Sequence, residues 1–105
     1  LLRTSVVALA MVSACPGLTM MISPWEAVQA VMAPGALDPL VKELLYVAVS
    51  ATNGCEYCTY SHTAAARRKG MTDAMLMEVM AVVGLANETN RLANGLRVPV
   101  DPQFR

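Results

Sequence analysis

Charge, aromatic residues and histidine are all scarce in this sequence. Only 15% of its 105 residues are charged and 5% are aromatic, while 55% are hydrophobic. The eight basic and eight acidic residues cancel, and the most basic run is the short Arg67-Arg68-Lys69. Because a nucleic-acid-binding surface requires a basic patch, we expect no nucleic-acid partner.

A long apolar segment is missing as well. The apolar run over residues 6–14 is shorter than the roughly 20 residues that a membrane-spanning helix needs, so we expect no membrane association. Residues 12–15 loosely resemble a lipoprotein cleavage site, but a buried helix ended by Pro16-Gly17 explains the same residues. The chain begins with Leu1 rather than Met, and we expect the natural protein to include residues upstream of it.

Cysteine is too rare, and odd in number, for a secreted disulfide scaffold. Of the three cysteines, two form the motif Cys55-Glu56-Tyr57-Cys58. Such a CxxC motif indicates redox or metal chemistry in a reducing compartment, so we expect a cytoplasmic protein. The third, Cys15, precedes a proline and has no partner nearby in the sequence, and we expect it to be a small buried hydrophobic residue.

The helix signals predict an all-α protein with a single domain over residues 1–105, which is an ordinary length for one domain. Ser23-Pro24-Trp25-Glu26 reads as a capping box with proline at the first helical position, and Asp38-Pro39 repeats the cap-plus-proline signature. Proline, glycine and capping residues together predict a bundle of about five helices, at residues 1–14, 23–33, 38–52, 55–69 and 72–94.

The hydrophobic content is higher than a chain of this length is expected to bury within a single subunit. A small domain covers only a modest fraction of its surface on folding, and eight methionines add to the alanine, valine and leucine that need covering. We therefore expect a homo-oligomer.

The residues able to carry chemistry gather in one predicted helix. At about 100° per residue, Cys58 lies about 60° from Cys55 and about 40° from His62, so the three side chains share one face. The two sulfurs can close a disulfide within one turn if Gly54 lets the backbone bend. The helix N-terminus alone favours the thiolate at Cys55, whereas a base one turn later, the only histidine of the chain, favours Cys58.

Glu43 stands twelve residues before Cys55, at the border of the apolar stripe of the preceding helix. A carboxylate in that place needs a partner. If Asn53-Gly54 folds the two helices antiparallel, Glu43 can reach the middle of the next helix, where it would orient His62 and hold the imidazolium.

The spacing Glu43-x11-Cys55-x2-Cys58-x3-His62 resembles the alkylhydroperoxidase AhpD core of the carboxymuconolactone decarboxylase (CMD) family, over about residues 37–94. The resemblance implies an AhpD-like helical bundle that assembles into trimers, hexamers or similar rings. It also implies a thiol-dependent peroxidase, an antioxidant oxidoreductase of the peroxiredoxin type. The substrate would be a hydroperoxide, a lipoyl or thioredoxin-like protein would be the dithiol donor, and no cofactor is needed beyond the redox-active disulfide.

On the same resemblance Cys58 is the peroxidatic nucleophile, Cys55 the resolving cysteine, and Glu43 with His62 the proton relay. The AhpD pattern often has a second histidine between the cysteines, where this chain has Tyr57. We expect Tyr57 to be an auxiliary hydrogen-bond donor, since a neutral phenol cannot shuttle protons near pH 7 as imidazole does. The decarboxylase branch of the family lacks the CxxC motif and is disfavoured.

Two other functions fit the same residues. One is a disulfide reductase or redox relay without peroxidase activity. The other is a zinc-stabilised helical interaction protein, which needs four ligands where only three are obvious, so Glu43 or Cys15 would have to supply the fourth. We expect no metal.

Overall fold

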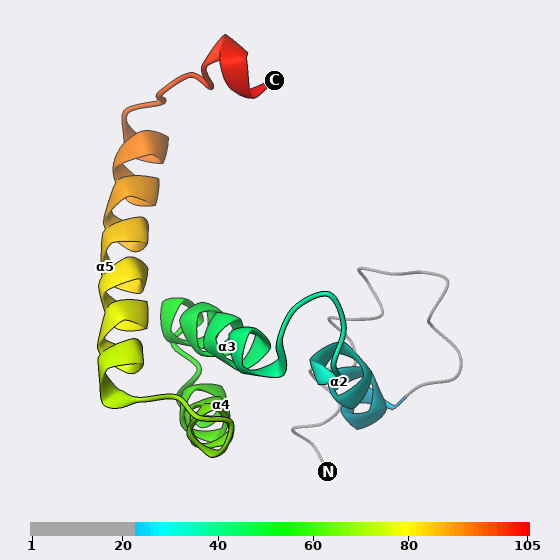
Figure 1. Ribbon diagram of the computed structural model, residues 1–105. Helices are drawn as coiled ribbons and strands as arrows, with labels where there is room; N and C mark the ends of the chain where they lie inside the picture. The colour runs from blue at the N-terminus through cyan, green and yellow to red at the C-terminus, as the bar shows by residue number, and fades with distance from the viewer. Residues whose placement is uncertain (1–22) are drawn as a thin grey trace. The chain divides into compact units, whose positions relative to one another are not determined.

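Residues 23–105 are described by the structure, a computed structural model, and they are helical. Their elements are α2 (Pro24–Met32), α3 (Pro39–Asn53), α4 (Glu56–Arg68), α5 (Asp73–Gly95) and a short 3-10 turn, η2 (Pro102–Phe104) (Figure 1). None of these residues lies in a strand, and the predicted all-α class is confirmed. The helix predicted over residues 1–14, and Cys15 after it, lie outside the described residues.

The chain divides into two compact units, one ending at Pro39 and the other spanning Leu40–Arg105. The described part of the first unit is built around α2, whose N-terminus is the predicted capping box. Ser23 Oγ accepts a hydrogen bond from the Glu26 backbone N–H at 3.2 Å, and the Ser23 N–H donates to Glu26 Oε2 at 2.8 Å. This reciprocal pair satisfies two backbone donors that a helix start would otherwise leave open.

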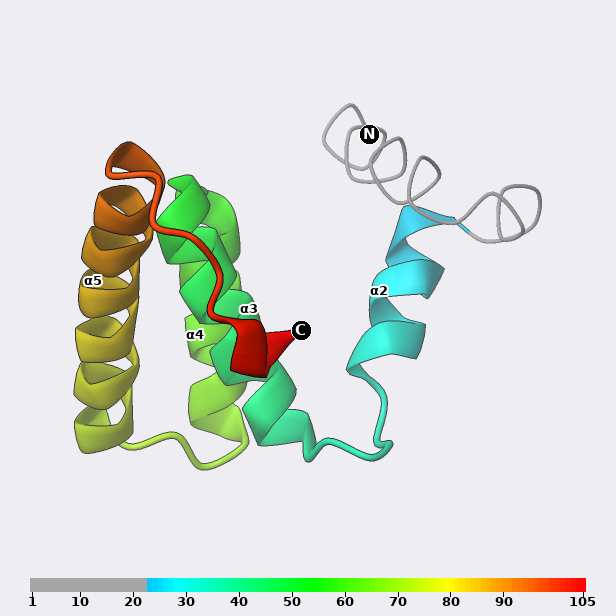
Figure 2. The ribbon, with the colours of Figure 1, turned by 90° about the horizontal axis from the view of Figure 1, so that it is seen from above.

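The second unit contains α3, α4 and α5. α3 and α4 lie side by side in both views of the ribbon and are joined by a short turn (Figures 1 and 2). α5 contacts the end of α3, where Asn87 donates a hydrogen bond to the hydroxyl of Thr52 at 3.1 Å. Within residues 23–105 no helix is both long and apolar enough to cross a membrane.

The turn between α3 and α4 fixes where the CxxC motif begins. Gly54 has φ +70°, its N–H donates to the carbonyl of Ala51 at 3.3 Å, and the N–H of Cys55 donates to that of Ser50 at 2.9 Å. These two bonds make a Schellman motif, which requires a left-handed residue that glycine adopts without penalty. The predicted break at Asn53-Gly54 is present, and Cys55 follows it directly as the N-cap of α4.

The core of the second unit is thin and partly polar. Val47 of α3 and Ala66 of α4 are fully buried, and Met71 is nearly so. The other two buried residues of the described chain are polar, and both, Glu43 and Ser50, lie on the same face of α3 as Val47. Glu43, predicted at the border of the apolar stripe, therefore lies at its centre with only 4% of its surface exposed.

Candidate functional site

The dithiol lies at the first turn of α4. Cys55 is the N-cap residue, and its Sγ accepts a hydrogen bond from the backbone N–H of Cys58 at 3.3 Å. Both cysteines are free thiols, and both are half-buried. A sulfur in the N-cap place faces the open N–H groups of the helix, which favour a negative charge there.

The pKa values of the two thiols are shifted in opposite directions. The Cys58 thiol and then its backbone N–H hydrogen-bond to the Cys55 sulfur and lower the pKa of Cys55 below its ordinary value of 9.0. The same interaction, with burial and the charge of Cys55, raises the pKa of Cys58 above 9.0. When the pair loses its first proton, the resulting thiolate therefore resides on Cys55, and Cys58 retains its S–H.

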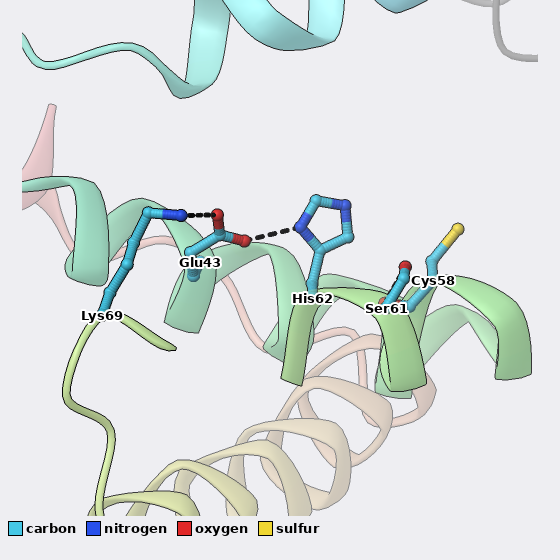
Figure 3. Close-up of polar contacts among 5 residues, drawn as sticks. All are labelled: Glu43, Cys58, Ser61, His62 and Lys69. Atoms are coloured by element: carbon cyan, nitrogen blue, oxygen red, sulfur yellow. Dashed lines mark hydrogen bonds and ion pairs between the residues drawn. The ribbon is translucent and has the colours of Figure 1, made fainter. Parts of the chain in front are cut away.

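Glu43, His62 and Lys69 form a hydrogen-bonded row across α3 and the C-terminal half of α4. Glu43 Oε2 lies 2.7 Å from His62 Nδ1, and Glu43 Oε1 accepts a hydrogen bond from Lys69 Nζ at 2.8 Å (Figure 3). Because a carboxylate can only accept, the proton of the neutral imidazole is on Nδ1, which leaves the lone pair on Nε2. In Figure 3 the ring lies between Glu43 on one side and Cys58 on the other.

The Glu43 carboxylate is charged despite its burial. Burial alone raises the pKa of Glu43, but the hydrogen bonds and charges of Lys69 and His62 outweigh it, so the pKa lies below the ordinary 4.5. A buried carboxylate that keeps its charge stabilises a protonated imidazole next to it. The contact between Glu43 and His62 expected from an antiparallel helix pair is thus present.

Tyr46 of α3 covers one face of the His62 ring. The ring centroids are 3.6 Å apart and the planes differ by 16°, so the two rings are stacked. Burial first, and then the charges of Cys58 and Cys55, raise the pKa of Tyr46 above 10.0. The phenol therefore stays neutral, lies within electrostatic reach of both sulfurs, and limits the rotation of the imidazole.

Tyr57, the expected auxiliary residue, lies on the outside of α4 with 69% of its surface exposed. The sequence does not single out Tyr46 or Lys69, although both follow helical spacing. Tyr46 is three residues after Glu43 on α3, and Lys69 is seven residues, or two turns, after His62. This spacing is the signal that could have identified them.

Within residues 23–105 no group of three or more His, Cys, Asp or Glu side chains is arranged to hold a metal ion. Cys15, a possible fourth zinc ligand, lies outside that range.

Known proteins have sequences similar to this chain. The chain is 39% identical over 72 residues to the alkyl hydroperoxide reductase AhpD of Solibacter usitatus, a match that covers 69% of this chain and 39% of that protein. It is 42% identical over 52 residues to an uncharacterized protein of the cox locus of Paracoccus denitrificans, covering 50% of this chain and 47% of that one. The chain thus spans less than half the length of these curated relatives.

A solved structure has the same fold. The crystal structure of the alkylhydroperoxidase AhpD core from Rhodospirillum rubrum superposes with a TM-score of 0.73 at 42% sequence identity, over 99% of this chain and 87% of that one. The sequence profile of the carboxymuconolactone decarboxylase family matches residues 22–101, a wider range than the predicted core of 37–94. Because that profile covers most of the chain and the helices superpose on an AhpD core, this chain belongs to the carboxymuconolactone decarboxylase family.

Proposed function

We propose that this chain is a thiol-dependent peroxidase, which reduces hydroperoxides through Cys55 and Cys58 with Glu43 and His62 as a proton relay. The observation that carries the proposal is the 2.7 Å contact between His62 Nδ1 and a buried, charged Glu43 carboxylate, one helical turn beyond Cys58. A histidine oriented by a carboxylate and placed beside a thiol is the arrangement of a nucleophile with its general base. The alkylhydroperoxidase relatives support the same chemistry at the level of the family.

The proposed reaction has three steps. His62 Nε2 takes the S–H proton of Cys58, and the thiolate attacks the terminal oxygen of the hydroperoxide. The O–O bond breaks, the leaving alkoxide takes the proton from the imidazolium, and Cys58 becomes a sulfenic acid. The Cys55 thiolate then attacks the Cys58 sulfur and displaces hydroxide, which leaves as water after protonation. A disulfide now joins the two cysteines, and the two electrons that the thiols have lost have reduced the peroxide.

Regeneration needs an external reductant. A dithiol donor, a lipoyl group or a thioredoxin-like protein, reduces the Cys55–Cys58 disulfide through a mixed disulfide. Cys55 at the N-cap is the better leaving group because its pKa is lowered, so the donor is expected to attack Cys58 and release Cys55 first.

One observation opposes the choice of Cys58 as the nucleophile. At rest the thiolate is favoured on Cys55, while the pKa of Cys58 is raised. The supporting consideration is that Cys58 lies one turn from His62, so its proton has an acceptor at the moment of reaction. Both sulfurs are within reach of a small oxidant, and the assignment has to be tested by substitution.

The test is stopped-flow measurement of thiol loss against hydrogen peroxide and organic hydroperoxides, in a Cys15→Ser background in which only two thiols are counted. Cys58→Ser is expected to abolish rapid thiol loss, while Cys55→Ser is expected to react once and leave a sulfenic acid that dimedone traps. Rapid oxidation of the Cys58→Ser variant would assign the nucleophile to Cys55 instead. Absence of rapid thiol loss with every peroxide would reject the peroxidase function.

The second candidate function is a disulfide reductase without peroxidase activity. It is favoured by one observation, the lowered pKa of Cys55 at the N-cap, because a thiolate there attacks disulfides readily. A reductase would reduce a model disulfide such as insulin with Cys55 as the attacking residue and would react slowly with peroxides. Measuring both activities on the same preparation separates the two functions.

A further inference from the structure

Lys69 completes the hydrogen bonding of the buried Glu43 carboxylate. Its Nζ donates to Oε1 at 2.8 Å, while the imidazole of His62 occupies Oε2 (Figure 3). The lysine side chain is 39% exposed and the Glu43 side chain 5% exposed, so the ammonium group reaches inward from the edge of the unit. Neither the family pattern used above nor the proposed relay contains this residue.

The backbone around Lys69 is held firmly. Lys69 is the C-cap of α4, and its N–H donates to the carbonyls of Ala65 and Ala66 at 3.2 and 3.0 Å. Gly70, at φ +102°, and Met71 complete a Schellman motif with bonds of 3.1 and 2.9 Å, and the Met71 side chain is buried. The lysine side chain therefore starts from a fixed point two turns beyond His62, which reduces the entropy lost when it binds Glu43.

Lys69 and His62 hydrogen-bond to the two oxygens of one carboxylate, so removing Lys69 changes the group that orients His62. Without Lys69, burial would raise the pKa of Glu43 against the opposition of His62 alone. A protonated Glu43 no longer stabilises an imidazolium. Removing Lys69 would therefore reduce the fraction of anionic Glu43 beside His62 on the acid side.

We propose that Lys69 is a positioning residue that keeps the buried Glu43 carboxylate anionic and in place, so that Glu43 can orient His62 through Nδ1. The inference extends the proposed peroxidase relay and rests on it only for its effect on turnover. Lys69 touches neither a sulfur nor a reacting oxygen in this scheme, and it acts through Glu43 alone.

Other charged groups near this row have separate partners. Arg67, two residues before Lys69, pairs with Asp73 at the start of α5 at 2.7 Å. The neutral phenol of Tyr46 stacks on the His62 ring, and the two thiols lie within electrostatic reach of that phenol. The charges that act on the Glu43 carboxyl are those of Lys69 and His62. Arg68 is an exposed cation next to Lys69 in the chain and offers a matched control for loss of one positive charge.

The test compares Lys69→Met, Lys69→Arg and Arg68→Met with the unchanged chain. The Glu43 carboxyl is titrated by carbon NMR, and the rate of peroxide-driven thiol loss is measured from pH 4 to pH 9. Lys69→Met is expected to raise the Glu43 midpoint by about one pH unit, a typical effect of removing an adjacent opposite charge, and to move the acid limb of the rate profile in the same direction. Lys69→Arg should retain most of the original behaviour, and Arg68→Met should change neither readout.

Each outcome is decisive. An unmoved Glu43 midpoint in Lys69→Met overturns the inference, as does a loss of rate that is equal at every pH, which indicates a merely structural lysine. If the unchanged chain does not react with peroxides but the Glu43 midpoint still moves, the peroxidase proposal fails and the role of Lys69 stands. Should Lys69→Met not fold, Lys69→Gln keeps a hydrogen-bond donor without the charge and gives the same comparison.

Discussion

At the scale of single residues, the most consequential placement is a charged carboxylate in the centre of a thin core. Glu43 occupies a position on α3 where burial by itself would raise its pKa, and its contacts with Lys69 and His62 hold the pKa below the ordinary value instead. A buried charge contributes to folding only while its partners are in place, and removing them leaves a desolvation cost. Glu43 therefore links the stability of the unit to the chemistry that we propose at the dithiol.

The lowered pKa of Glu43 predicts a pH-dependent contribution to stability. A carboxyl whose folded pKa lies below the ordinary 4.5 stabilises the fold above that value, and the contribution is lost as the pH falls through the folded pKa. Glu43→Gln is expected to reduce the free energy of unfolding at pH 7 by about 1.5–3 kcal/mol, the range for hydrogen bonds to charged groups. Urea denaturation at pH 7 and pH 3 measures this, and a gap between the two proteins that does not narrow at pH 3 would contradict it.

Tyr46 predicts a separable effect on the histidine. Tyr46→Phe keeps the flat ring that stacks on His62, whereas Tyr46→Leu keeps an apolar side chain but removes the ring and its stack. Aromatic pairs are worth about 0.5–1.5 kcal/mol, so Tyr46→Leu is expected to slow thiol oxidation by roughly 2- to 10-fold. Tyr46→Phe should stay near the original rate. A slow Tyr46→Phe variant would show instead that the hydroxyl, near the sulfurs, is the part that matters.

The sequence predicts which candidate site residues share a face of one helix, and it predicts side-chain contacts between two helices less well. The periodicity of α4 placed Cys55, Cys58 and His62 on one face. The same periodicity puts Tyr57 about 100° from Cys58, on the opposite side from His62, and the structure exposes it. The stack of Tyr46 on the imidazole depends on how α3 and α4 cross, which no local spacing specifies.

At the scale of elements, helix ends are the best-predicted features because their signals are local. The capping box at Ser23 and the glycine turn at Gly54 both stand where the sequence indicates them. The end of α5 departs from that pattern. Arg97 has φ +52° and closes a third Schellman motif, with its N–H on the carbonyl of Asn94 at 3.2 Å and that of Val98 on Ala93 at 3.0 Å.

The left-handed residues at these helix ends predict that two substitutions change stability in opposite directions. Gly54→Ala places a Cβ in open space, so its cost comes from the backbone angle alone and is expected to be about 1–2 kcal/mol. Arg97→Gly relieves the same strain and is expected to gain up to about 1 kcal/mol. Thermal and urea unfolding of both variants check the signs. If both substitutions changed the free energy of unfolding in the same direction and by the same amount, the turns and not the left-handed backbone angles would control stability.

At the scale of the whole molecule, much apolar surface is left uncovered on a single chain. Along α3, Val41, Leu45 and Val49 recur every four residues and are between 41% and 58% exposed. Four large apolar residues of α5 are also exposed, namely Met77, Val82, Leu85 and Leu92. Apolar side chains arranged in a stripe are typical of a face that another subunit covers. This pattern agrees with the homo-oligomer, trimer or hexamer, that we expect from the composition and the family resemblance.

The oligomer predicts how substitutions on that stripe behave. Leu45→Glu places a charge in the middle of the exposed stripe of α3, and in an assembly it would be buried without a partner, so we expect dissociation to smaller species. Ala64→Glu, at an exposed position of α4, is the matched control and should leave the assembly unchanged. Light scattering coupled to size-exclusion chromatography gives the mass. Because Leu45 lies two residues from Glu43 but on the outer face of α3, thiol oxidation in dissociated Leu45→Glu also shows whether the Glu43–His62 pair needs the assembly. An unchanged mass would remove this stripe as the subunit interface.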